Sequence, residues 1–340
     1  MSTVMERLNQ ALYSAFEQDA RVHLIGEDLL DPYGGAFKVS KGLSSAYPER
    51  VLTSPVSEAA ISGVAGGMAL RGLLPVVEIM FGDFSTLIAD QVINSLTKFR
   101  AMYNGAVDVP VVIRAPMGGR RGYGPTHSQT LEKLFLGVPG LRVLAPNTLS
   151  DPGQLLLDAI LRDPGPVFFV ENKLLYLKEV LGQEALAEYQ VEQNTPTDSY
   201  AATTRLQIQG APKPTLTLVA YGYMAELARE AQQRLAFEHE IFCELVAPSQ
   251  LAPFGADGAL DPLLLASIQR TRHLLTIEEG SYSLGWGAEV AARAAQALGP
   301  ALQAVQRVAA AEAPIPASVP LERANLPGVD DIVAAARKMV

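Results

Sequence analysis

Short apolar runs and helix-like runs alternate along most of this chain, and this alternation is what most limits its fold. Strands are predicted at 22–26, 74–79, 109–114, 141–145 and 167–171, and helices at 57–70, 83–103 and 151–162. Helices placed between successive strands are typical of a parallel sheet with helices on its faces. We therefore expect an α/β domain in the first half of the chain.

The pattern weakens after residue 180 and then starts again. Polar residues and prolines accumulate up to Pro214, as expected for a boundary between domains. Further strands are predicted at 215–220, 240–245, 274–278 and 304–308, and further helices at 224–235, 261–271 and 287–298. We predict two α/β domains, each with a parallel sheet: residues 1–185, a linker at 186–214, and a smaller domain at 215–340.

Composition excludes several classes of protein. With 340 residues, of which 49% are hydrophobic, the chain is long enough for two cores. A net charge of −9 argues against nucleic acid or an anionic membrane surface as partner. The apolar runs are shorter than the roughly 18–20 residues that a membrane span needs. Cys243, the single cysteine, is predicted to be a buried thiol, and we expect a cytoplasmic protein.

Common catalytic motifs are absent from the sequence. It has no glycine-rich dinucleotide fingerprint between a strand and a helix, no phosphate-binding P-loop and no G-x-S-x-G segment. The four histidines lie too far apart for a helical metal pair. The sequence therefore gives no local motif in favour of a nucleotide enzyme, a serine hydrolase or a zinc hydrolase.

One segment that could carry chemistry begins at Ser57-Glu58, where a predicted helix starts. An acid at this place can simply complement the helix dipole, which is the more common explanation. However, Ala59, Gly63 and Gly67 follow at intervals of four residues. Glycine inside a helix costs about 1 kcal/mol relative to alanine, so the spacing suggests that another backbone or a ligand approaches closely. The alternative is that this segment is partly loop.

Two further segments follow predicted strands. Phe84 lies just after the strand at 74–79, where an aromatic ring can stack on a ligand or simply pack in the core. His127 lies in a glycine-rich loop after the strand at 109–114. A loop histidine can transfer protons near neutral pH, although most are ordinary surface residues.

Several short motifs lie in order along nearly the whole chain. They are Gly26-Glu27-Asp28, Gly34-Gly35-Ala36-Phe37, Ser57-Glu58-Ala59-Ala60, Asp90-Gln91-Val92-Ile93-Asn94, His127-Ser128-Gln129, Pro139-Gly140-Leu141, Glu171-Asn172, Thr276-Ile277-Glu278-Glu279 and Glu312-Ala313-Pro314-Ile315-Pro316. Each motif alone is weak, but in this order and spacing they resemble the beta subunit of thiamine-diphosphate-dependent 2-oxoacid dehydrogenases of the pyruvate, branched-chain and acetoin types. The resemblance implies a transketolase-like pyrimidine-binding domain followed by a smaller transketolase C-terminal-like domain.

The resemblance also implies roles for individual residues. Glu58 would hydrogen-bond the aminopyrimidine ring nitrogen of thiamine diphosphate, where a carboxyl group that shares a proton helps the cofactor to become a nucleophile. Phe84 would stack on the pyrimidine, and His127 would assist later proton or acyl transfer. Glu27 and Asp28 would form an acidic pair near the same interface.

A second subunit is implied as well. The diphosphate and its magnesium need a Gly-Asp-Gly motif followed about 25–30 residues later by asparagine, whose oxygens suit a hard cation. This chain has only Gly82-Asp83-Phe84. We therefore expect magnesium to be bound by an alpha subunit in an α2β2 heterotetramer. A structural monovalent cation, potassium, is implied at backbone carbonyls of Val111, Val112, Ala159, Ile160 and Asp163.

The implied reaction is oxidative decarboxylation of a small 2-oxo acid, pyruvate-like or branched-chain, with acyl transfer to lipoamide on a lipoyl-bearing acyltransferase. Gly124-Pro125-Thr126 departs from the Gly-Ala-Gln that many members have, which leaves the acceptor open. Acetoin cleavage, or acyl or ketol transfer to another carrier protein, is the alternative. A non-catalytic chain that stabilises an alpha subunit is the alternative from another class.

Overall fold

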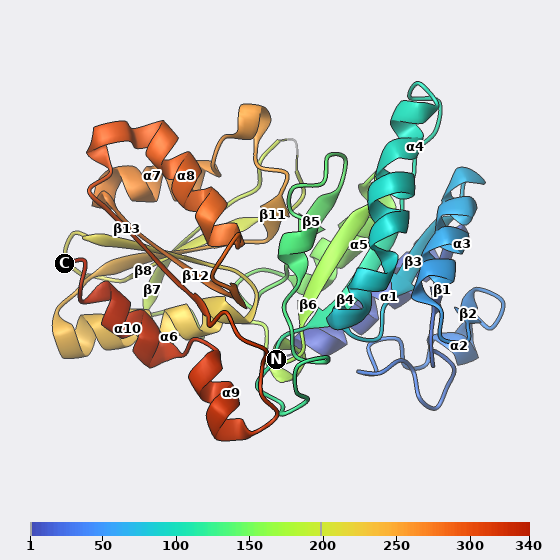
Figure 1. Cartoon of the computed structure of the whole chain (residues 1–340), viewed down its shortest axis with the longest axis horizontal. Helices are drawn as coiled ribbons and strands as arrows, with labels where there is room; N and C mark the ends of the chain where they lie inside the picture. Colours follow the sequence, from blue (N-terminus) through green and yellow to red (C-terminus); the bar gives the residue numbers. More distant parts are fainter. Residues whose placement is uncertain (1, 198) are drawn as a thin grey trace.

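The computed structural model describes residues 2–197 and 199–340, which form two α/β units lying side by side (Figure 1). Within these residues, the first unit has a seven-stranded sheet in the order β11-β5-β6-β4-β3-β1-β2. Its strands are β1 (Val22–Gly26), β2 (Val51–Thr53), β3 (Leu74–Glu78), β4 (Val112–Met117), β5 (Arg142–Leu144), β6 (Val167–Asn172) and β11 (Gln250–Ala252). Neighbouring strands are parallel except β11, which pairs antiparallel with β5. The predicted α/β fold of the first half is confirmed.

Helices cover both faces of this sheet. The helices α1 (Val4–Gln18) and α5 (Pro152–Arg162) pack together on one face, and α3 (Glu58–Leu70) lies on the other. In β3, Val76 belongs to the apolar cluster of α1 and α5, whereas Val77 belongs to that of α3. Because both faces are buried, the central strands carry mostly apolar side chains on both sides. The unit also contains the short helices α2 (Leu43–Ala46), η3 (Glu132–Leu134) and η4 (Leu175–Leu177).

The segment predicted as one long helix at 83–103 changes its helical type along its length. It consists of the 3₁₀ helix η1 (Gly82–Ile88), the π-helical segment η2 (Gln91–Leu96) and the α-helix α4 (Thr97–Met102). The prediction is therefore wrong in helix type, because an apolar period near 3.6 does not separate an α-helix from tighter or wider turns. At the start of η1, a Cβ atom on Gly82 would overlap Met117 Cγ, so this position requires glycine.

In the described part of the second unit, six strands form a sheet in the order β13-β12-β9-β10-β8-β7. The strands are β7 (Tyr189–Asn194), β8 (Thr203–Ile208), β9 (Leu216–Ala220), β10 (Cys243–Pro248), β12 (His273–Ser281) and β13 (Ala304–Ala310). The helices α6 and α10 pack on one face of this sheet, and α7 and α8 pack on the other. The helices are α6 (Tyr223–His239), η5 (Ala256–Gly258), α7 (Pro262–Thr271), α8 (Trp286–Leu298), η6 (Gly299–Ala301), α9 (Val319–Asn325) and α10 (Val329–Ala336).

Two parts of the sequence prediction need correction here. The predicted linker at 186–214 contains β7 and β8, which pair antiparallel with each other, and β8 also pairs antiparallel with β10. The second sheet is therefore mixed rather than parallel throughout. As an edge strand, β7 has mostly exposed polar side chains, so its sequence lacks the apolar run by which a buried strand is recognised.

The two units are joined by more than their connecting chain. The strand β11 follows β10 in the sequence, yet it pairs with β5 at the edge of the first sheet. Tyr221 and Trp286 of the second unit belong to the same buried apolar cluster as Ile113 and Phe168 of the first. The units therefore pack through a continuous core.

Across the described residues, no helix combines the length and the apolar character that crossing a bilayer requires. Cys243 is buried as predicted, and burial raises the pKa of its thiol to about 12.

Candidate active site

The candidate residues gather where neighbouring parallel strands end. Gly26 at the end of β1 is in register with Glu78 of β3, and Met117 at the end of β4 is in register with Asn172 of β6. Since β3 also pairs in parallel with β4, the loops after β1, β3, β4 and β6 meet at one edge of the sheet. Open α/β sheets bind ligands outside the carboxyl ends of their strands.

Two carboxylates, Glu27 and Glu58, lie next to each other at this edge. Glu27 Oε1 accepts a hydrogen bond from the backbone N–H of Ser57 at 3.2 Å, and Glu58 is the first residue of α3. The two residues are only 6% and 5% exposed. Burial raises the pKa of Glu27, and the charges of Glu58 and of the exposed Asp28 raise it further. Glu27 therefore holds a proton more readily than a surface carboxylate does.

An aromatic cluster places His127 against η1. The His127 ring lies edge-on to Phe81 and Phe84, with ring centroids 4.8 Å and 5.3 Å away. Phe84 and His127 are half-buried, which leaves part of each ring accessible. Because α3 packs against η1, Glu58 and Phe84 lie on neighbouring elements. The structure thus brings the predicted residues Phe84 and His127 into contact and places Glu58 on the adjacent helix.

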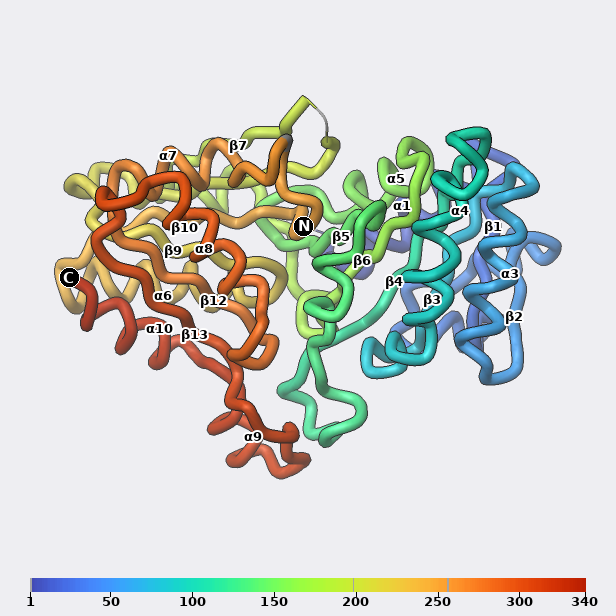
Figure 2. Tube along the Cα trace, turned by 45° about the horizontal axis from the view of Figure 1, so that its top comes forward, coloured from blue at the N-terminus to red at the C-terminus, as the bar shows by residue number. Residues whose placement is uncertain are grey.

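The His127 loop (residues 118–129) is held from the second unit by two buried carboxylates. Glu279 Oε1 accepts a hydrogen bond from the backbone N–H of Gly119 at 2.8 Å. Glu322 of α9 accepts one from the backbone N–H of Arg120 at 2.7 Å. Figure 2 shows α9 beside this loop at the junction of the units. Sequence analysis missed Glu322 because it lies about 200 residues from the loop, with no local motif.

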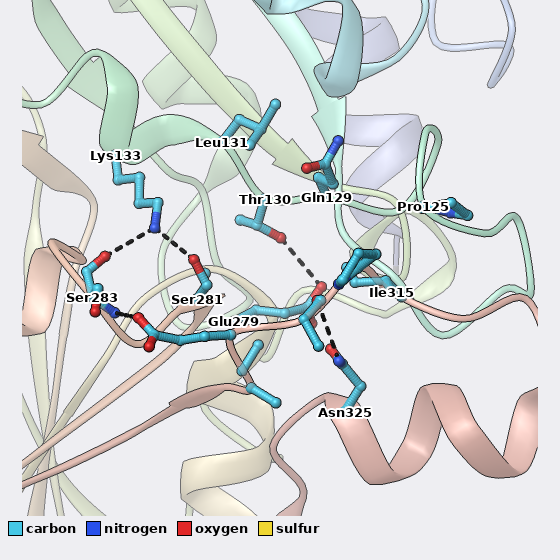
Figure 3. Close-up of a pocket in the computed structure, with 16 residues that line it drawn as sticks. Pro125, Gln129, Thr130, Leu131, Lys133, Glu279, Ser281, Ser283, Ile315 and Asn325 are labelled. Atoms are coloured by element: carbon cyan, nitrogen blue, oxygen red, sulfur yellow. Dashed lines mark hydrogen bonds between the residues drawn. The ribbon is translucent and has the colours of Figure 1, made fainter.

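A cavity of about 570 Å³ lies where this loop meets the second unit (Figure 3). Residues of both units line it, including Glu279 on one side. Lys133 Nζ donates to Ser281 Oγ at 2.5 Å and to the Ser283 carbonyl at 2.9 Å across this junction. The volume of this cavity is within the range that small organic ligands occupy.

A buried ion network lies under the candidate site. Arg114 of β4 is fully buried, and its Nη1 donates to Glu78 Oε2 of β3 at 2.7 Å. Its Nε and Nη2 donate to the two carboxylate oxygens of Glu171 of β6 at 2.7 Å and 2.8 Å. The Tyr176 hydroxyl also donates to Glu171. The network joins three adjacent strands close to the ends that carry the site loops.

A second group of buried carboxylates lies between the two units. Glu132, Glu278 and Glu279 are at most 4% exposed, and Glu132 accepts a hydrogen bond from the Tyr221 hydroxyl. Among the described residues, the Oε2 atom of each of these three glutamates has no hydrogen-bond partner. Burial raises the pKa of Glu132 to about 7, although the Tyr221 hydrogen bond acts to lower it. Glu132 is therefore a buried acid that takes up a proton near neutral pH.

This raised pKa makes stability depend on pH, and we expect Glu132→Gln to remove part of the dependence. Between the ordinary glutamate pKa of 4.5 and about 7, the folded chain binds more protons at Glu132 than the unfolded chain does. The contribution of Glu132 to stability therefore falls as pH rises through this window, by up to about 1.4 kcal/mol per pH unit, and no longer changes above it. The measurement is the unfolding temperature of wild type, Glu132→Gln and the exposed control Glu184→Gln at both ends of the window. A fall in Glu132→Gln as large as that in the other two proteins would contradict the prediction.

The residues predicted to hold a structural cation lie close together beside β4 and α5. The side chains of Val112, Ala159 and Ile160 belong to one buried cluster. The Val111 carbonyl accepts a hydrogen bond from the Val167 N–H at 2.8 Å, which leaves one lone pair on this oxygen. The Asp163 carboxylate accepts hydrogen bonds from Arg142, Tyr200 and Gly165, which occupy most of its lone pairs. This cation site stays a prediction.

The comparisons with known proteins match both units. The pyrimidine-binding domain of transketolase matches residues 2–178, and the transketolase C-terminal domain matches residues 206–332. In fold, the chain is similar to a solved structure described as a split gene transketolase, an inactive beta4 tetramer, with a TM-score of 0.73 at 22% identity over 100% of this chain and 98% of that one. At this identity the likeness concerns the fold alone.

Curated relatives match along almost the entire chain. The pyruvate dehydrogenase E1 component subunit beta-2, mitochondrial, of Oryza sativa subsp. japonica is 39% identical over 99% of this chain and 85% of its own. The acetoin:2,6-dichlorophenolindophenol oxidoreductase subunit beta of Cupriavidus necator is 34% identical over 97% of this chain and 95% of its own. The chain therefore belongs to the transketolase-like family that includes the beta subunits of the pyruvate dehydrogenase E1 component.

Proposed function

We propose that this chain is the beta subunit of a thiamine-diphosphate-dependent 2-oxoacid dehydrogenase component, which decarboxylates a 2-oxo acid and passes the acyl group to a lipoyl-bearing acyltransferase. The observation that carries the proposal is the buried Glu27–Glu58 pair beside the Phe84–His127 contact, at the carboxyl ends of the strands. The proposal is also supported by relatives that are named as beta subunits of the pyruvate dehydrogenase E1 component.

These residues fit the pyrimidine half of the cofactor. When bound, thiamine diphosphate supplies a thiazolium carbon that can attack the keto carbon of the substrate once it has lost a proton. The nearly buried Glu58 would hold or share a proton at the pyrimidine ring nitrogen, because a carboxyl group can both donate and accept there. Phe84 offers a half-buried ring for stacking, and His127 next to it would move protons in the later transfer.

The diphosphate half and its magnesium are assigned to an alpha subunit in an α2β2 assembly. The chain has Gly82-Asp83-Phe84 in place of a Gly-Asp-Gly magnesium motif. Oδ1 of Asp83 accepts hydrogen bonds from the backbone and side chain of Gln129. On α3, the small residues Ala59, Ala60 and Gly63 are exposed next to the buried Glu58, so a second chain could approach closely there. We also keep the structural potassium ion at the carbonyls beside β4 and α5 as part of this proposal.

Co-expression with an alpha chain that carries the magnesium motif tests the proposal. Purified complex should release carbon dioxide from pyruvate or from branched-chain 2-oxo acids and acylate a lipoyl domain. Acetoin cleavage is the second candidate, because a relative of nearly equal length is named as the beta subunit of an acetoin oxidoreductase. Acetoin turnover without 2-oxo acid turnover would favour that candidate. A stable complex that turns over none of these compounds would contradict both and favour a non-catalytic partner.

A further inference from the structure

Lys173, a residue that the sequence analysis left without a role, lies directly under the His127 loop. It follows β6 at the edge where the candidate site gathers, and its side chain is fully buried. A buried lysine is rare unless its charge is balanced by specific partners. The partners of Lys173 therefore indicate what it does.

The ammonium group of Lys173 contacts the backbone of His127 and two aromatic rings. Nζ donates a hydrogen bond to the His127 carbonyl at 2.5 Å. It also lies 5.1 Å from the ring centroid of Phe81 and 5.4 Å from that of Tyr123, within the range of cation–π attraction. Phe81 and Tyr123 also touch each other, with ring centroids 6.0 Å apart. One cation thus binds the loop and the aromatic residue that contacts the His127 ring.

The hydrogen bond from Lys173 to the His127 carbonyl holds a part of the His127 loop that no other residue named above binds. Glu279 and Glu322 bind the first half of the loop, at Gly119, Arg120 and Gly122. Asp83 binds its end, at Gln129. The hydrogen bond from Lys173 lies between these anchors, at His127 itself.

We propose that Lys173 is a positioning residue that fixes the His127 ring against Phe81 and Phe84 by holding the His127 carbonyl and the rings of Phe81 and Tyr123. The proposal rests on the proposed function in one respect only, because the benefit of a fixed His127 is measured through catalysis. The order that Lys173 gives to the loop is a property of the chain itself.

The charge of Lys173 is sensitive to its surroundings. Burial lowers its pKa to about 8, the carboxylates of Asp83, Glu279 and Glu322 act to raise it, and Arg121 acts to lower it. Above that pH the neutral amine keeps its hydrogen-bonding atoms but loses its attraction to the rings of Phe81 and Tyr123. Loss of the charge should therefore loosen the loop at alkaline pH.

The test compares Lys173→Met and Lys173→Arg with the exposed control Lys178→Met, all in complex with the alpha chain. Hydrogen–deuterium exchange of residues 118–129 and the rate of acyl transfer are measured on the same samples across a pH series. Lys173→Met should speed exchange in the loop and slow transfer by about 10²-fold, because a displacement of about 1 Å costs that much. Lys173→Arg should recover part of both, since arginine also donates to carbonyls and stacks on rings. In Lys173→Arg, the fall in rate should begin at a higher pH than in wild type, because a guanidinium does not lose its proton in this range.

Two results would overturn the proposal. One is unchanged loop exchange in Lys173→Met, whatever happens to the rate. The other is an alkaline limb of the pH profile that is the same in wild type and in Lys173→Arg. If the wild-type complex has no activity on any substrate tested, the proposed function fails, but the exchange comparison still decides whether Lys173 orders the loop.

Discussion

Replacing Glu58 with Gln in the assembled complex should lower the rate of decarboxylation by about 10²–10⁴-fold, the usual contribution of a positioned acid–base group. The amide keeps the size of the side chain and can still form a hydrogen bond, but it cannot give up or take a proton as a carboxyl group does. Because Glu58 is only 5% exposed, water has little access to replace it. The measurement is initial carbon dioxide release under saturating cofactor.

Two further variants make this result specific. Glu49→Gln changes an exposed acid of the same unit and should leave the rate unchanged. Glu27→Gln removes the neighbouring carboxyl group and should have a smaller effect than Glu58→Gln, since Glu27 is engaged with the Ser57 N–H. If Glu58→Gln retains most of the wild-type rate, the role assigned to Glu58 is wrong, whatever the other variants do.

Replacing Arg114 with Met should destabilise the fold by about 3–5 kcal/mol, the range seen when one partner of a buried ion pair is removed. The side chain of Arg114 is fully buried, as is that of Glu171, and Glu78 is 5% exposed. Without the guanidinium, two carboxylates would remain buried on neighbouring strands with no cation between them. Thermal unfolding of the purified chain measures the loss.

The matched control is Arg100→Met. Arg100 pairs with Asp108, and both side chains are 58% exposed, so this pair should contribute less than about 1 kcal/mol. An Arg114→Met protein that unfolds at the same temperature as Arg100→Met would contradict the expected role of the buried network. An insoluble Arg114→Met beside a soluble Arg100→Met would agree with it.

The buried elements of the fold could be predicted from the sequence because their apolar patterns are strong. The strand β1 has the bounds predicted for it, and α3 and α5 begin within one residue of their predicted starts. Other elements could not be predicted in this way. The strand β7 has polar side chains on an outer edge, and the three residues of β11 are too few for a pattern. The 3₁₀ and π segments of η1 and η2 have the same apolar spacing as an α-helix.

The residues of the candidate site likewise include some that could be predicted from the sequence and some that could not. Glu58, Phe84 and His127 could be named because they lie in local motifs at element boundaries, and the family resemblance gave them roles that remain proposals. The residues that hold the His127 loop could not be named. Lys173 and Glu322 come from segments that are far from the loop in the sequence, and a buried lysine looks like a surface lysine until its partners are known.

The strand β11 belongs to the first sheet, although in the sequence it follows four strands of the second unit, β7 to β10. A gene cut between residues 185 and 215 would therefore yield an amino-terminal fragment with β5 uncovered along one side. An uncovered strand of this kind offers free backbone N–H and C=O groups to any other extended chain, and self-association follows readily. Expressing the two halves of this protein separately should thus give an aggregation-prone amino-terminal fragment. A soluble truncation of the first half would need to include residues 250–252, which cover β5.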